Sequence, residues 1–131
     1  HHARARQQFE ALGLYRGQPP VLRALWEKEG LTQTELAKML DIAPATLTKM
    51  LQRMEKAGFI CRHADKDDQR ISRVYLTENG RSVQNQVEKI WTVMEKEAFG
   101  NFSADELILL RQFLLKIRDN LVQATGEEPW K

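Results

Sequence analysis

The sequence of 131 residues contains a single cysteine, Cys61, which excludes an intramolecular disulfide framework. A lone thiol suits a reducing compartment, and we expect a cytoplasmic protein in which Cys61 packs as a small apolar side chain. No apolar run approaches the ~20 residues that span a bilayer, and there is no secretory hydrophobic segment. The sequence therefore indicates neither a membrane protein nor a disulfide-stabilised secreted one.

The features of an enzyme site are also missing from the sequence. There is no glycine-rich phosphate loop, no nucleophile paired with a base and no catalytic pair of carboxylates. His1, His2 and His63 do not stand at the spacing of ligands in a metal site. We therefore expect no enzyme activity, no metal and no cofactor. The chain begins with histidine instead of methionine, so His1 and His2 are either native or the remnant of a tag.

The sequence lacks a large excess of either sign of charge. Its 20 Lys and Arg residues and 18 Asp and Glu residues give a net charge of only +2. This balance neither requires nor excludes nucleic-acid binding, so the positions of the cations matter more than their number. A hydrophobic content of 42% over 131 residues suits one domain with a sizeable core.

Two short helices are predicted in the middle of the chain. Thr32 and Glu35 have the spacing of a capping box, so the first helix begins at Thr32. Its predicted apolar face consists of Leu36, Met39 and Leu40. The turn Asp41–Ala43 interrupts the pattern, and Pro44 suits the first turn of the second helix.

The second helix has one apolar stripe and is predicted to end at Gly58 as a left-handed cap. The stripe has helical spacing and consists of Leu47, Met50, Leu51 and Met54. Two helices joined by a three-residue turn predict a helix-turn-helix, whose second helix enters the major groove of DNA. The alternative is an ordinary amphipathic helix with a solvated outer face.

The outer side of this helix carries small, hydroxyl, amide and cationic residues. The candidates to contact bases or phosphates are Pro44, Ala45, Thr46, Thr48, Lys49, Gln52 and Arg53. Arg53 can bind guanine through two hydrogen bonds, and Gln52 can bind adenine in the same way. Ala43 has no side-chain acceptor at the expected N-cap, so a DNA phosphate could satisfy the first N–H groups. The alternative is that Asp41 or water caps them.

A charged hairpin is predicted after the second helix. Its strands cover Phe59–His63 and Arg70–Thr77, and the polar sequence ADKDDQ forms the tip between them. Three acids at the tip are unusual in a DNA contact. They are explained if Asp68 braces the guanidinium of Arg70 and directs it into the minor groove. The alternative is a solvated run of charges.

The flanking segments are predicted to be helical. Two helices occupy residues 3–29, and a long helix runs over 78–99 with Thr77 as its N-cap. In the last helix, Ser103 and Glu106 form a capping box. Apolar residues cover more than one side of that helix: Leu107, Ile108, Leu110, Phe113, Leu114, Leu115, Ile117, Leu121 and Val122. We infer a homodimer on an inverted-repeat DNA site; complete burial within a monomer is the alternative.

The pattern resembles the MarR family of bacterial winged-helix transcription regulators. The resemblance rests on LTQTELAKML, PATLTKMLQRMEKAGFI, Asp68-Gln69-Arg70 and VYLTENG. It implies a mainly α fold with a two-stranded β wing, and Arg70 as the arginine of the minor groove. The winged helix-turn-helix lobe would cover residues 18–77, the dimerisation helices 1–17 and 78–124, and a tail 125–131. The family's wing motif is Asp-Arg-Arg, so Gln69 departs from it and weakens one backbone contact.

The resemblance also implies a repressor that responds to a small aromatic effector. Tyr15, Arg16 and Trp26 are the local candidates to bind it, although Tyr15 and Arg16 could equally pack in the loop between the first two helices. In the peroxide sensors of the family we expect a cysteine near the first helix, so thiol sensing does not carry over to Cys61. The competing function is a winged-helix module that binds protein and has lost its DNA contact.

Overall fold

The computed structural model describes residues 2–126, so His1 and most of the predicted tail, 127–131, lie outside the described residues. The helices are α1 (His2–Ala11), α2 (Gln18–Glu27), α3 (Gln33–Leu40), α4 (Pro44–Lys56), α5 (Glu78–Ser82), α6 (Gln84–Phe99) and α7 (Ala104–Thr125). The strands are β1 (Leu31–Thr32), β2 (Ile60–Ala64) and β3 (Ser72–Leu76). The chain forms two compact units that divide after Thr92, within α6.

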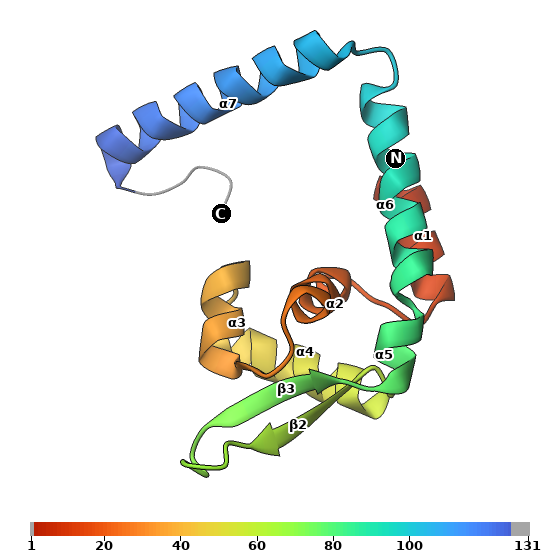
Figure 1. Ribbon diagram of the computed structural model, residues 1–131, viewed down its shortest axis with the longest axis vertical. Helices are drawn as coiled ribbons and strands as arrows, with labels where there is room; N and C mark the ends of the chain where they lie inside the picture. The colour runs from red at the N-terminus through yellow and green to blue at the C-terminus, as the bar shows by residue number, and fades with distance from the viewer. Residues whose placement is uncertain (1, 127–131) are drawn as a thin grey trace. The chain divides into compact units, whose positions relative to one another are not determined.

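The sheet of the first unit has three antiparallel strands in the order β1-β3-β2, one more than the sequence predicted. β2 and β3 form the expected hairpin, which projects from the lobe containing α2, α3 and α4 (Figure 1). The additional strand pairs Leu31 with Val74 and Thr32 with Arg73. A strand of two residues is too short to show an alternating pattern in the sequence. Thr32 also carries the signal of a helix N-cap, which hid the strand. The mainly helical fold with a β wing is confirmed.

The core of this unit is formed by aliphatic side chains from α2, α3, α4 and the sheet. Those that solvent does not reach, or barely reaches, include Leu22, Leu25, Leu36, Leu47, Leu51, Met54, Ile60 and Val74. Three residues of the predicted stripe of α4 are therefore buried. The fourth, Met50, is half-buried and lies against Gly17, where an added Cβ would stand 2.7 Å from the Met50 methyl. These contacts thus decide which side of α4 faces inward.

The apolar face of α3 differs from the prediction. Leu36 and Ala37 are buried and Leu40 is half-buried, but Met39 is 56% exposed. At about 100° per residue, positions 36, 37 and 40 share one side of a helix, and position 39 lies away from it. Assigning Met39 to the core was therefore wrong. The Thr32 cap is confirmed, since its hydroxyl accepts from the Glu35 N–H at 3.0 Å.

The single long helix predicted over residues 78–99 is divided at Val83 into α5 and α6. Thr77 caps α5 as expected, accepting from the Gly80 N–H. The Gly80 carbonyl, however, accepts a hydrogen bond of 2.8 Å from the indole N–H of Trp26. This is the carbonyl that an uninterrupted helix would pair with the N–H of Gln84. A long-range contact from α2 therefore occupies the acceptor at the point of division.

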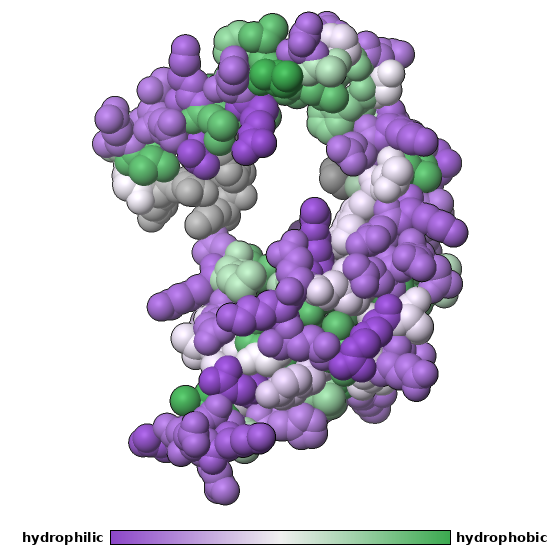
Figure 2. Space-filling model, viewed as in Figure 1, coloured by the Kyte–Doolittle hydropathy of each residue, from purple (hydrophilic) through white to green (hydrophobic). Residues whose placement is uncertain are grey.

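The second unit contains α7, whose N-terminus is closed by the predicted capping box of Ser103 and Glu106. None of the 22 residues of α7 is buried. Hydrophobic side chains are instead visible among charged ones over α7 (Figure 2). The large exposed ones are Leu107, Ile108, Leu109, Phe113, Leu114, Ile117, Leu121 and Val122.

Candidate nucleic-acid interface

The outer side of α4 presents the predicted contact residues to solvent. Pro44, Ala45, Thr46, Lys49, Gln52 and Arg53 are all exposed. Ala45, Lys49, Gln52 and Arg53 lie on the side opposite the buried Leu47, Leu51 and Met54, so burial of that stripe turns the cations outward. The helix begins at Pro44 and is followed by Gly58 with φ +88°, as predicted. This side of α4 can approach the edges of bases.

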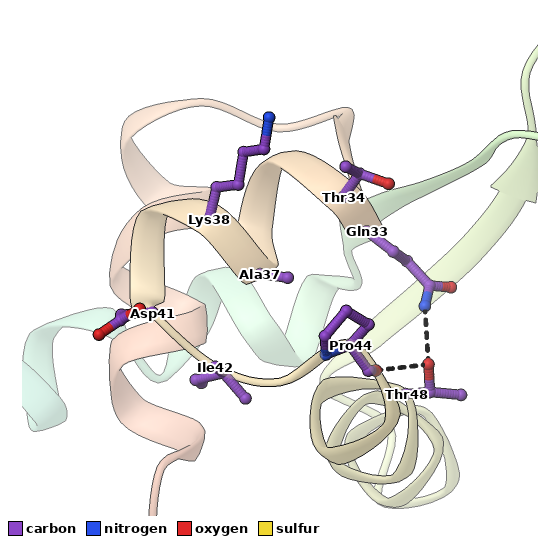
Figure 3. Close-up of a pocket in the computed structure, with 8 residues that line it drawn as sticks. All are labelled: Gln33, Thr34, Ala37, Lys38, Asp41, Ile42, Pro44 and Thr48. Carbon is purple, nitrogen blue, oxygen red and sulfur yellow. Dashed lines mark hydrogen bonds between the residues drawn. The ribbon is translucent and has the colours of Figure 1, made fainter. Parts of the chain in front are cut away.

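The N-terminus of α4 has no side-chain cap, and Ala43 occupies the N-cap position. Asp41 instead ends α3 in the left-handed conformation, with φ 52°. The alternative in which Asp41 caps α4 is therefore wrong. Beside this end is a hollow of about 490 Å³ (Figure 3). It is lined by Gln33, Thr34, Ala37 and Lys38 of α3, Asp41 and Ile42 of the turn, and Pro44 and Thr48 of α4.

Thr48 differs from its neighbours on α4 because it is half-buried and its hydroxyl has two partners. The hydroxyl donates to the carbonyl of Pro44 at 3.0 Å and accepts from Gln33 Nε2 at 3.3 Å. Its single proton is therefore already used. Towards a base it can offer only its remaining lone pair and its methyl group.

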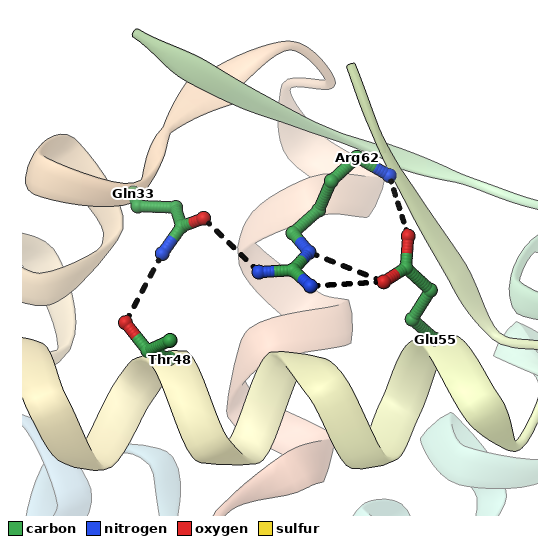
Figure 4. Close-up of polar contacts among 4 residues, drawn as sticks. All are labelled: Gln33, Thr48, Glu55 and Arg62. Atoms are coloured by element: carbon green, nitrogen blue, oxygen red, sulfur yellow. Dashed lines mark hydrogen bonds and ion pairs between the residues drawn. The ribbon is translucent and has the colours of Figure 1, made fainter. Parts of the chain in front are cut away.

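A chain of polar contacts continues from Thr48 to the wing (Figure 4). Gln33 Oε1 accepts from Arg62 Nη1 at 3.4 Å. Arg62 on β2 then binds Glu55 of α4, through Nη2 to Oε1 at 2.9 Å and through its backbone N–H to Oε2 at 3.2 Å. The sequence carries no local signal for Gln33 or Arg62, because their residue types are common on surfaces and their partners are distant in the chain.

The wing tip holds Arg70 in the arrangement that the sequence predicted. Its Nε and Nη2 donate to the two carboxylate oxygens of Asp68, each at 3.0 Å, and its backbone N–H also donates to Oδ1. The Arg70 side chain nevertheless remains 90% exposed. The guanidinium of Arg70 lowers the pKa of Asp68, so the pair stays ionised at neutral pH. A bidentate pair of this kind orients the guanidinium without covering it.

A second ion pair supports the base of the tip. Arg73 Nε donates to Asp65 Oδ1, and Arg73 Nη1 donates to the carbonyl of Gly30 at 2.8 Å. The other oxygen of Asp65 accepts from the backbone N–H groups of Asp67 and Asp68 at 3.0 and 3.1 Å. These contacts, Arg73 first, lower the pKa of Asp65. The acids at the tip thus have structural partners, and the simple solvated run of charges does not describe Asp65 or Asp68.

The candidate effector residues are not equivalent. Tyr15 is 58% exposed and Arg16 is also exposed, in the loop between α1 and α2. Trp26 is half-buried, and its N–H is bonded to Gly80.

Cys61 is a free thiol of intermediate exposure on β2. Over residues 2–126 there is no cluster of side chains suited to a metal ion. In the same range, no helix is long and apolar enough to cross a membrane.

Comparison with known proteins decides the family. The MarR family profile matches residues 14–72, which include the helix-turn-helix and the tip of the wing. The transcriptional regulator HosA of Escherichia coli is 35% identical over 113 residues, which cover 86% of this chain and 84% of HosA. The chain belongs to the MarR family. A second relative, the uncharacterized HTH-type transcriptional regulator YdgJ of Bacillus subtilis, is 31% identical over 87% of this chain and 70% of its own length. Both relatives bear the name of transcriptional regulators.

Solved structures agree with the assignment to the MarR family. The transcriptional regulator SlyA has a TM-score of 0.83 and 27% identity, over 93% of this chain and 86% of SlyA. A point mutant of MepR from S. aureus, solved bound to an oligodeoxyribonucleotide, has a TM-score of 0.64 and 27% identity, over 92% of this chain and 88% of MepR. The MarR-family chain described here thus shares its fold with a protein that has been seen on DNA.

Proposed function

We propose that this MarR-family protein is a repressor that binds an inverted-repeat DNA site as a homodimer and responds to a small aromatic effector. The observation that supports DNA binding best is the pair of cationic surfaces on one lobe. Lys49 and Arg53 are exposed on α4, and Arg70 is exposed at the wing tip. Residues 18–77 would form the DNA-binding lobe, and residues 1–17 and 78–124 the dimerisation helices.

In this proposal α4 enters the major groove and Arg70 enters the adjacent minor groove. Arg53 and Gln52 have side chains that can form paired hydrogen bonds with guanine and adenine. Arg70 is suited to a narrow minor groove because its negative potential attracts an exposed guanidinium. Asp68 orients the guanidinium through Nε and Nη2. Because Nη1 takes no part in this ion pair, it remains able to donate a hydrogen bond to DNA.

The homodimer is supported by α7, which exposes eight large apolar residues and buries none. Exposed apolar surface of that extent is typical of an interaction site. Two copies related by a two-fold axis would place two α4 helices in successive major grooves, ~34 Å apart. This spacing explains why the DNA site should be an inverted repeat.

The N-terminus of α4 is proposed to receive a DNA phosphate. Its first N–H groups have no side-chain cap, and the positive end of the helix dipole favours an anion. An aspartate introduced as Ala43→Asp would occupy this position, stabilising the helix but repelling the phosphate. Lower DNA affinity with higher thermal stability would support the contact, and unchanged affinity would contradict it.

The effector is proposed to be a small aromatic acid near the loop between α1 and α2. Exposed Tyr15 and Arg16 offer a ring and a cation there, whereas the Trp26 N–H already has a partner. Release of a bound duplex by benzoate in the parent, and weaker release in Arg16→Ala, would support this site. Equal release in both proteins would contradict the assignment of Arg16.

The competing function is a winged-helix module that binds protein without binding DNA. Such a module has no need of three exposed cations at positions 49, 53 and 70, all of which this chain keeps. The DNA-binding proposal therefore explains more of the surface.

Titration of the protein with a duplex selected from a random pool tests the proposed function. We expect a two-fold symmetric site and an affinity that falls steeply with added salt, because bound cations release counterions from phosphate. Arg70→Ala and Arg53→Ala should each cost about 1–3 kcal/mol of binding free energy, with relaxed base preference in Arg53→Ala. Equal affinity of the double variant and the parent would contradict the proposal. The control is Lys89→Ala, which removes an exposed cation on α6, outside α4 and the wing.

A further inference from the structure

The contacts of Gln33 and Arg62 suggest a role that goes beyond general DNA binding, although the inference rests on the proposed function. Their chain begins and ends on α4, at Thr48 and at Glu55. These two residues are separated by two helical turns, about 10 Å along the axis. Gln33 of α3 bonds to α4 at Thr48, and Arg62 of β2 bonds to α4 at Glu55. A hydrogen bond between Gln33 and Arg62 links these two attachments.

The apolar contacts of α4 alone do not define its rotation sharply. Burial of Leu47, Leu51 and Met54 selects the inward side, but the hydrophobic effect has no preferred direction. Hydrogen bonds do have one, since they weaken with small changes in distance and angle. Two directional attachments on the same flank, seven residues apart, resist rotation of the helix about its own axis.

Rotation of α4 would change which base atoms its side chains reach. Side-chain ends lie at a radius of about 6 Å, so a turn of about 10° moves them by about 1 Å. A displacement of this size is enough to break a hydrogen bond to a base edge. Contacts to phosphates through long flexible side chains tolerate it better. A loose helix would therefore lose base preference more than affinity.

We propose that Gln33 is a positioning residue that sets the rotation of α4 through the chain Thr48–Gln33–Arg62–Glu55 and thereby determines the base preference of the protein. Gln33 is suited to this task because its amide donates to Thr48 and accepts from Arg62 at the same time. It also directs the Thr48 hydroxyl, which donates its proton to the Pro44 carbonyl and leaves one lone pair for a base donor.

The test compares two substitutions of Gln33 in the full chain. Gln33→Leu has a similar volume and makes neither hydrogen bond. Gln33→Glu keeps an acceptor for Arg62. Its carboxylate accepts from the Thr48 hydroxyl once that hydroxyl turns away from the Pro44 carbonyl, so both attachments of α4 remain. The control is Thr34→Val, an exposed neighbour on α3 that is outside the polar chain. For each protein, binding is measured on every single-base variant of the selected duplex, together with thermal unfolding.

We expect Gln33→Leu to reduce discrimination by about fivefold or more at one or two base pairs, while the unfolding temperature changes little. Gln33→Glu should restore the parent's order of preferences, with affinity lowered evenly for all duplexes by its added negative charge. Thr34→Val should keep the parent's preferences. If Gln33→Leu keeps them too, or Gln33→Glu does not restore them, the positioning role is wrong.

A measurement without DNA separates this inference from the proposed function. In the free protein, the backbone amide resonances of residues 45–56 report the rotational setting of α4. They should shift in Gln33→Leu and not in Thr34→Val. Failure of the parent to bind any duplex would contradict the proposed function alone, whereas unshifted resonances in Gln33→Leu would contradict the positioning role alone.

Discussion

The lobe that contains α2, α3, α4 and the sheet has aliphatic side chains similar to those of helix α7, but the two place them in opposite environments. In α4, Leu47 and Leu51 are at most 1% exposed, whereas in α7 Leu114 and Ile117 are 47% and 49% exposed. The lobe can bury its apolar residues because helices and a sheet surround one centre. Among the described residues of its own unit, α7 has no such neighbours. The difference teaches that the lobe buries its apolar residues through its own contacts, whereas the cover of α7 is what the proposed second copy would supply.

The largest expected effect comes from breaking this partnership with Leu114→Glu. A charge in the proposed interface should give a monomer, because a buried unpaired carboxylate is strongly unfavourable. The affinity for the inverted repeat should fall by about 10²–10⁴, since the second half-site no longer benefits from linkage. Analytical ultracentrifugation and the duplex titration measure the two effects. Asn120→Glu is the matched control, because Asn120 is exposed on the same helix. A dimer that persists in Leu114→Glu would show that the exposed apolar side chains of α7 do not form the interface.

A smaller effect is expected from the other side of the comparison, with Leu51→Ala in the lobe. The side chain is fully buried, so its loss should cost about 2–5 kcal/mol of unfolding free energy. Denaturant unfolding followed by circular dichroism measures the change. Met39→Ala is the control, because that side chain is 56% exposed and should contribute much less. Equal losses in the two variants would show that the lobe does not depend on its core as described.

The smallest effect is expected at the wing, where electrostatics and not burial holds the chain. The pKa of Asp65 lies below its ordinary value of 3.8, so its contribution to stability is present above that value. It is lost as the pH falls through the lowered pKa of the folded state. Asp65→Asn should therefore be less stable than the parent at pH 7, and the difference should shrink towards pH 3. Thermal unfolding across this range checks the trend, with Asp67→Asn at the exposed tip as the control.

Local signals predicted the helix ends well because each depends on residues within one turn. Thr32, Thr77 and Ser103 cap their helices as expected, and Pro44 begins α4. The pairing of Asp68 with Arg70 was also predictable, since two residues of separation in a tight turn bring opposite charges together. The MarR-family resemblance then gave the order of the remaining elements.

Other features could not be predicted because they depend on residues distant in the chain. The indole N–H of Trp26 bonds to the Gly80 carbonyl, 54 residues away, at the place where α5 and α6 divide. The exposure of Met39 follows from which side of α3 meets α2 and α4. Thr48 has the residue type of a base contact, and only Gln33, 15 residues earlier, turns it towards α3.

By itself, the sequence determined the caps at Thr32, Thr77 and Ser103, which side of α4 carries cations and that the last helix is apolar on more than one side. These properties follow from local hydrogen bonding and from the period of the helix. The tertiary structure alone decided the third strand, the division at Val83 and the polar chain from Thr48 to Glu55. Each of these requires a donor and an acceptor that only folding brings within about 3 Å.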